Sequence, residues 1–107
     1  MTYEEKLKKI FNKIETKAVL EQLIEETGEL IQASAKQLRI MRGINPTPIT
    51  HNKNIENIQE EIADVQLCIE LAIRAIGSDS VETKKKIDLI KQRKLSRWLD
   101  RLGIREE

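Results

Sequence analysis

An acidic and apolar segment occurs twice in this chain, at residues 21–30 and again at residues 56–65, and it constrains the fold more than any other feature. The first copy reads EQLIEETGEL and the second reads ENIQEEIADV. In both copies the apolar residues recur at helical spacing, so each segment is predicted to lie on an α-helix. Any fold of the chain must therefore accommodate two helices with the same pattern of charge and apolar residues.

Each copy carries two carboxylates that are three positions apart. These are Glu26 and Glu29 in the first copy, and Glu61 and Asp64 in the second. On a helix such a pair points to one side, about 60° and 120° from the centre of the apolar stripe at roughly 100° per residue. Two such helices packed side by side would bring the four carboxylates to one point. Because uncompensated carboxylates repel one another and resist burial, the pattern predicts a cation among them.

The composition indicates a single all-helical domain over residues 1–107. The chain is rich in Ile, Leu, Glu and Lys, and it has 3% aromatic residues and 4 glycines, which is typical of helical proteins. Its 19 basic and 18 acidic residues nearly balance, which argues against nucleic-acid or membrane-surface binding, since both usually need a basic excess. One cysteine, Cys68, and no apolar run of membrane-spanning length are present, so we expect a cytoplasmic protein.

Four helices are predicted along the chain. The first follows Thr2, whose hydroxyl can form a capping box with Glu5. The other three are predicted at about residues 16–41, 54–77 and 81–102. Residues 43–54, with two prolines, are predicted to be a loop. We therefore expect an all-α fold that resembles a four-helix bundle, in which two central antiparallel helices carry the carboxylates.

The third predicted helix indicates an oligomer. Its second half, residues 65–76, is apolar on nearly every side. A helix exposed to water along one face would not have this pattern, so burial on two sides is expected. With four helices per chain, the second cover is predicted to be another copy of the protein, in a homodimer or homotetramer. In the last helix, Trp98 lies in the apolar stripe and is predicted to pack in the core.

The carboxylate pairs also indicate which cation the site would take. A ligand set made only of Glu and Asp oxygens suits Mg²⁺ or Mn²⁺. The closest all-helical alternative is a di-iron carboxylate bundle, which needs Glu-x-x-His on two of its helices. Here the third residue after each glutamate is Glu29 or Asp64, and the one histidine, His51, falls in the predicted loop. The sequence therefore favours Mg²⁺, with Mn²⁺ as the alternative.

The two acidic segments resemble the signature of the MazG-like all-α nucleoside triphosphate pyrophosphohydrolases. That signature is commonly written E-E-x-G-E-L on one helix and E-E-x-A-D-V on the next. This chain has EETGEL at residues 25–30 and EEIADV at residues 60–65. The resemblance covers the two central helices, and the chain length and four-helix plan fit the small members of the family.

The resemblance implies hydrolysis of a nucleoside triphosphate, standard, non-standard or deoxy, between its α and β phosphates. The products would be a nucleoside monophosphate and pyrophosphate, in a nucleotide-cleansing role. The metal ligands that the resemblance implies are Glu26, Glu29, Glu61 and Asp64. Mg²⁺ bridging these carboxylates and the phosphate oxygens would neutralise charge and align the attacking water. The proton of that water needs an acceptor, and the candidates are Glu25 and the ligand carboxylates, Glu29 among them.

Two polar residues on the central helices are candidate substrate contacts. Lys36 lies two turns beyond Glu29, on about the same side of its helix. It is predicted either to contact a phosphate or to pair with a glutamate at the surface. Asn57 lies one turn before Glu61 and is a candidate contact for a sugar or a phosphate.

The last helix offers three further candidates. Lys94, Arg97 and Arg101 have a spacing similar to a basic motif near the C-terminus of small family members. They are predicted either to contact substrate or to form ion pairs at a subunit boundary. Two other classes of function stay open: a non-catalytic helical interaction module with a solvated acidic face, and a nucleic-acid-binding protein that uses the basic last helix. The near-neutral net charge makes nucleic-acid binding the weakest of the three.

Overall fold

The structure, a computed structural model, describes residues 1–43 and 48–105, and these residues form four helices and no strand. The helices are α1 (Tyr3–Lys13), α2 (Thr16–Arg42), α3 (His51–Ile76) and α4 (Ser80–Arg101). The predicted all-α class is therefore confirmed. Within these described ranges, no helix combines the length and the apolar character that a membrane span requires.

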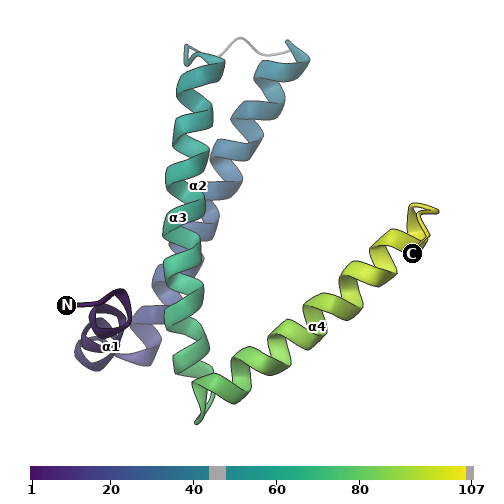
Figure 1. Ribbon diagram of the computed structural model, residues 1–107. Helices are drawn as coiled ribbons and strands as arrows, with labels where there is room; N and C mark the ends of the chain where they lie inside the picture. Colours follow the sequence, from purple (N-terminus) through teal and green to yellow (C-terminus); the bar gives the residue numbers. More distant parts are fainter. Residues whose placement is uncertain (44–47, 106–107) are drawn as a thin grey trace.

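α2 and α3 form an antiparallel pair at the centre of the molecule (Figure 1). The contact between them is by far the most extensive between any two helices of the described chain. Most of the residues that the pair buries are small or carry an amide: Ala33 and Gln37 in α2, and Asn54, Cys68 and Ala72 in α3. Small side chains allow the two helix axes to approach closely. This close pairing places the two repeated acidic segments opposite each other.

The start of α1 and the end of α2 are both set by capping residues. Thr2 and Glu5 form the expected capping box, in which the Glu5 N–H donates to the Thr2 hydroxyl at 3.1 Å and the Thr2 N–H donates to the Glu5 carboxylate at 3.0 Å. α2 ends at Gly43, whose φ of 64° is a left-handed conformation that glycine adopts without strain.

α3 begins at His51 instead of near residue 54, so the predicted loop over residues 43–54 is wrong in its last part. The cause is Thr50, which caps the helix: its hydroxyl accepts a hydrogen bond from the Lys53 N–H at 3.2 Å. Residues 44–47, in the first part of the predicted loop, lie outside the described residues.

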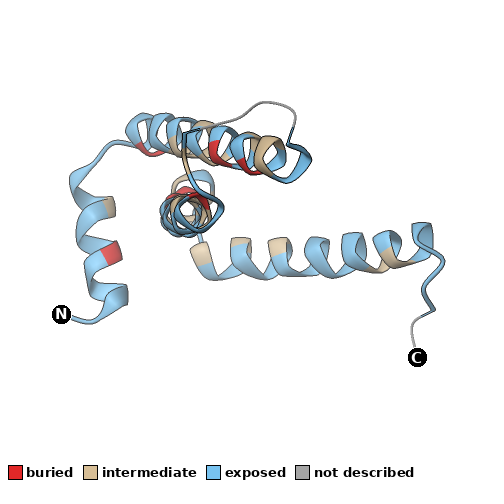
Figure 2. Ribbon diagram, turned by 90° about the horizontal axis from the view of Figure 1, so that it is seen from above, coloured by how far each residue is buried: buried red, intermediate tan, exposed pale blue. Residues whose placement is uncertain are grey.

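α1 and α4 add little burial to the central pair. α1 contributes one buried residue, Leu7, and α4 contributes none. Figure 1 shows α4 diverging from the pair, and Figure 2 shows that the buried residues lie in α1, α2 and α3. Trp98 is 62% exposed, so the prediction that it packs in the core is wrong for a single chain. Other apolar residues of α4, such as Leu89 and Leu95, are exposed as well.

A single chain exposes far more surface than a compact protein of this size. Its accessible surface is 8784 Å², against about 6,100 Å² for a compact monomer of 12.4 kDa. Its Cα radius of gyration is 17.6 Å, against about 13 Å for a compact domain of this length. Large apolar side chains contribute to the surplus, among them Ile24 at 73% and Ile31 at 64% exposure. One copy of the chain therefore leaves much of its apolar surface uncovered.

Candidate metal centre

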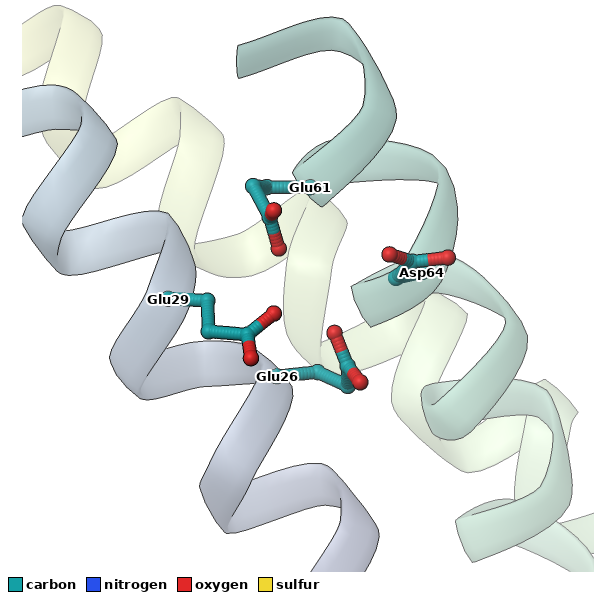
Figure 3. A group of neighbouring side chains, drawn as sticks. All are labelled: Glu26, Glu29, Glu61 and Asp64. Carbon is teal, nitrogen blue, oxygen red and sulfur yellow. The ribbon is translucent and has the colours of Figure 1, made fainter. Parts of the chain in front are cut away.

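The carboxylates of the two repeated segments meet between α2 and α3. Glu26 and Glu29 from α2, and Glu61 and Asp64 from α3, each place one carboxylate oxygen within 4.8 Å of those of the other three. Figure 3 shows the four side chains pointing toward one another across the space between the helices. The prediction that packing of the two helices brings the four carboxylates to one point is confirmed.

The spacing within each helix and the antiparallel pairing together produce this cluster. Residues i and i+3 occupy successive turns on one side of a helix, so each pair presents both of its carboxylates to the other helix. The antiparallel direction brings Glu26 near Asp64 and Glu29 near Glu61. Glu26 and Glu61 are partly buried, while Glu29 and Asp64 are exposed. The cluster is therefore closed by the helix pair on one side and open to solvent on the other.

Two oxygens of the cluster are buried without a hydrogen-bond donor. Oε2 of Glu26 and Oε2 of Glu61 have no partner among the described residues. The other oxygen of Glu26 accepts a hydrogen bond from Gln22 Nε2 at 2.8 Å. No Lys or Arg in the described part of the chain forms an ion pair with any of the four carboxylates. A buried carboxylate oxygen without a partner is destabilising. The cluster therefore has both the negative charge and the unpartnered oxygens that a cation would bind.

The crowding raises the pKa of two of the carboxyls above the usual 4.5. For Glu26 the largest cause is desolvation between the helices, followed by the negative charge of Glu29. For Glu29 the largest cause is its proximity to Glu61, with which the protonated form can share a hydrogen bond. A raised pKa means that the folded chain disfavours the charged forms, and a divalent cation in the cluster would favour them.

The thiol of Cys68 lies close to this cluster and is an inert neighbour. Cys68 is buried, and it lies in the half of α3 for which the sequence predicts burial. Burial, and then the negative charges of Glu26 and Asp64, raise the pKa of the thiol. Since the thiolate is the form that binds metal, the site has oxygen ligands only. Such a set fits Mg²⁺ or Mn²⁺, which take carboxylate oxygens and keep coordination positions for water and phosphate.

A cavity of about 340 Å³ adjoins the cluster. Its walls are Glu29, Gln32, Ala33, Lys36, Asn54, Asn57 and Glu61. The structure therefore places both Lys36 and Asn57 beside the cluster, in the wall of the same cavity. Gln32 and Asn54 were not predicted to line the site. Asn54 did give a signal, because it stands four residues before Ile58, at a position of the α3 apolar stripe where a polar side chain needs a buried partner.

The structure of one chain does not bring the other predicted residues into the cluster. Glu25 is exposed and lies outside the group of converging oxygens, although its negative charge adds to the raised pKa of Glu29. Lys94, Arg97 and Arg101 lie on the diverging α4, and none of them is in the wall of the cavity beside the cluster.

Comparison with protein-family models, with curated proteins and with solved structures finds no match for this chain. Its class is therefore defined by the geometry: an all-helical protein with a four-carboxylate cluster between two antiparallel helices. Membership of the MazG-like family stays a prediction from the two sequence motifs.

We predict that the carboxylate cluster destabilises the metal-free protein progressively as the pH rises through the acid range. The folded-state pKa values of Glu26 and Glu29 lie above the usual 4.5, so the folded chain binds these protons more tightly than the unfolded chain does. This contribution to stability is fully present below the unfolded values and is lost as the pH rises through the raised values. Urea unfolding in EDTA, from about pH 4 to about pH 8, measures it.

The substitution Glu29→Gln removes one of the crowded charges. It should stabilise the metal-free protein at neutral pH and flatten the pH dependence, whereas Glu21→Gln, at an exposed position of the same helix, should do neither. A Glu29→Gln variant that is less stable than the unmodified protein in EDTA at neutral pH would contradict this account of the cluster.

Proposed function

We propose that this protein is a Mg²⁺-dependent nucleotide pyrophosphohydrolase. Its substrate would be a nucleoside triphosphate, standard, non-standard or deoxy, and its products a nucleoside monophosphate and pyrophosphate. The observation that carries this function is the convergence of four carboxylates, two of them with a buried, unpartnered oxygen, beside a polar cavity. The resemblance of residues 25–30 and 60–65 to the MazG-like signature supports the same chemistry.

In this function the metal ligands are Glu26, Glu29, Glu61 and Asp64. A Mg²⁺ ion held there, or Mn²⁺ in its place, would neutralise the charge of the phosphates and make a bound water more nucleophilic. The exposure of Glu29 and Asp64 leaves the solvent side of the cluster open to a triphosphate chain.

The other roles fall to residues around the cluster. The Lys36 ammonium, in the cavity wall, is suited to pair with a phosphate oxygen. The Asn57 amide in the same wall can donate a hydrogen bond to a phosphate or a sugar oxygen. Glu25 lies next to the ligand Glu26 along the chain but outside the converging group, so its carboxylate can accept the proton of the attacking water, with Glu29 as the alternative acceptor.

We further propose that the functional form is a homodimer or a homotetramer. Apolar residues seven positions apart form a stripe along one side of a helix. Exposed stripes of this kind are Ile24, Ile31 and Leu38 on α2, and Ile62, Ile69 and Ile76 on α3, all at least 41% exposed. The surplus of roughly 2,700 Å² over a compact monomer is of the order that obligate assemblies cover. In such an assembly Lys94, Arg97 and Arg101 would contact a neighbouring copy, either at its substrate or at the subunit boundary.

The enzymatic proposal predicts that removing one ligand charge abolishes turnover. Glu61→Gln and Asp64→Asn should each lower Mg²⁺-dependent pyrophosphate release by about 100-fold or more, because the metal is no longer held for catalysis. Their helical circular dichroism should be unchanged. The measurement is a screen of common and damaged nucleoside triphosphates, scored by pyrophosphate release.

Glu60→Gln is the matched control for this screen. It makes the same change one residue away, at an exposed carboxylate outside the cluster, and it should leave turnover within about twofold of the unmodified protein. Turnover retained in Glu61→Gln or Asp64→Asn would contradict the enzymatic proposal. A chain that releases no pyrophosphate from any nucleotide and gives no metal-dependent heat with one would support the non-catalytic interaction module instead.

The oligomer predicts a mass in solution of at least twice 12.4 kDa, measured by light scattering at micromolar concentration. Ile69→Glu should dissociate it, because a charge would be buried in the covered α3 stripe. Gln66→Glu, which creates the same side chain at an exposed position of that helix, is the control and should leave the mass unchanged. A monomeric mass for the unmodified protein would overturn this part of the proposal.

A further inference from the structure

A fully buried amide, that of Asn54, lies in the wall of the cavity beside the carboxylate cluster. Asn54 has 0% exposure, and its Nδ2 donates to the carbonyl oxygen of Ala33 at 3.1 Å and to Gln37 Oε1 at 3.2 Å. An amide NH₂ group has two hydrogens, so both donors of Asn54 are used within the chain. The only group of this side chain that is left to form a further hydrogen bond is its acceptor, Oδ1.

The hydrogen bonds around Asn54 fix the direction in which that acceptor points. If the amide were flipped, Oδ1 would face the Ala33 carbonyl oxygen, and two acceptors would be in contact. Gln37 is held in turn, because its Nε2 lies 2.8 Å from His51 Nδ1 and its Oε1 accepts from Asn54. Gln37 therefore donates to His51, and the chain of bonds from His51 to Ala33 keeps the Asn54 amide in one orientation.

Oδ1 of Asn54 has no hydrogen-bond partner among the described residues. A buried carbonyl oxygen without a donor is destabilising, and native structures rarely leave one without a purpose. Asn54 also lines the 340 Å³ cavity together with Lys36 and Asn57. The residue therefore borders a space that a ligand can enter, but its Oδ1 is covered in the ligand-free chain. A ligand that displaces the covering atoms can supply the missing donor.

The chemistry of an acceptor limits which part of a nucleotide can bind there. Ionised phosphate oxygens are acceptors themselves and would be repelled by Oδ1, whereas sugar hydroxyls and base N–H groups are donors. The position along α3 agrees, because seven residues separate Asn54 from Glu61. At about 1.5 Å per residue this is about 10 Å of helix. A nucleotide whose phosphates lie at the cluster would place its nucleoside at a distance of this order.

We infer that Asn54 recognises the nucleoside part of the substrate. Its Oδ1 would accept a hydrogen bond from a sugar hydroxyl or from a base N–H. Lys36 and the carboxylate cluster then take the phosphates. This inference rests on the proposed function, and it adds to it a residue that selects for a donor group on the nucleoside. Gln37 acts as a positioning residue, because it orients the Asn54 amide without lining the cavity.

The test compares two ligands that share their phosphates and differ in the nucleoside. Titration calorimetry with Mg²⁺ is done for a non-hydrolysable nucleoside triphosphate and for inorganic tripolyphosphate, which has no nucleoside. Asn54→Leu should lower the affinity for the nucleotide by about tenfold or more, which is the loss expected for one hydrogen bond with a buried partner. The affinity for tripolyphosphate should stay within about twofold. Asn52→Leu makes the same change at an exposed position of α3 and should alter neither affinity.

Two analogues then identify the donor. If it is a sugar hydroxyl, the effect of Asn54→Leu should vanish with a 2′,3′-dideoxynucleotide. If it is a base N–H, the effect should vanish with ribose 5-triphosphate, which has no base. This comparison of a substitution with a ligand change isolates the one contact, as a double-mutant cycle does.

A second measurement needs no substitution, in case Asn54→Leu weakens the α2–α3 contact too much to fold. In the ¹⁵N-labelled unmodified protein, the Asn54 side-chain amide resonances should shift when the nucleotide binds and should stay in place when Mg²⁺-tripolyphosphate binds. Equal shifts with both ligands, or none with the nucleotide, would overturn the inference. So would an Asn54→Leu variant that loses affinity for Mg²⁺ alone, since Oδ1 would then be a metal ligand.

The failure of this inference differs from the failure of the proposed function. Nucleotide that binds with Mg²⁺ and is hydrolysed, but with an affinity that Asn54→Leu does not change, refutes the role of Asn54 alone. A protein that binds no nucleotide in the presence of Mg²⁺ refutes both.

Discussion

The mutual repulsion of four carboxylates is the constraint on which the rest of this structure depends. Their oxygens lie within 4.8 Å of one another, and the raised pKa values of Glu26 and Glu29 show that the folded chain opposes their ionisation. The α2–α3 pair holds them together nonetheless, through close packing at small residues such as Ala33 and through the buried bonds of Asn54. A fold that keeps such a cluster at the cost of stability is typical of a functional site, where strain serves binding or catalysis.

In the proposed function, residues of both α2 and α3 bind the metal and the substrate. The carboxylates would hold the metal, Lys36 would take phosphate charge, and the amide of Asn54 would meet the nucleoside further along α3. The outer sides of α2 and α3 carry uncovered apolar stripes, and α4 diverges with an exposed Trp98. The single chain is therefore a central pair of helices that carries the cluster, with two peripheral helices, and it leaves an apolar surface that the proposed oligomer would cover.

Much of this arrangement could be predicted from the sequence because it depends on local periodicity. The positions of Glu26 and Glu29 around their helix, relative to its apolar stripe, predicted that both side chains point to the same side. Thr2 and Glu5 predicted the cap of the first helix. Asn54 was missed because its partners, Ala33 and Gln37, lie 21 and 17 residues away, and only the packing of the two helices brings them together. Trp98 was misplaced for a different reason: an apolar stripe indicates which side of a helix favours burial, but it does not show whether the rest of the same chain covers that side.

The most direct test of the central claim is binding of Mn²⁺ to the metal-free protein, followed by electron paramagnetic resonance. A metal site at the cluster predicts saturable binding that Glu26→Gln strongly weakens. The same change at Glu56, a surface carboxylate paired with Lys53, should leave binding intact. If the unmodified protein showed no saturable binding, or if Glu26→Gln bound Mn²⁺ as well as the unmodified protein does, the four carboxylates would not be a metal site.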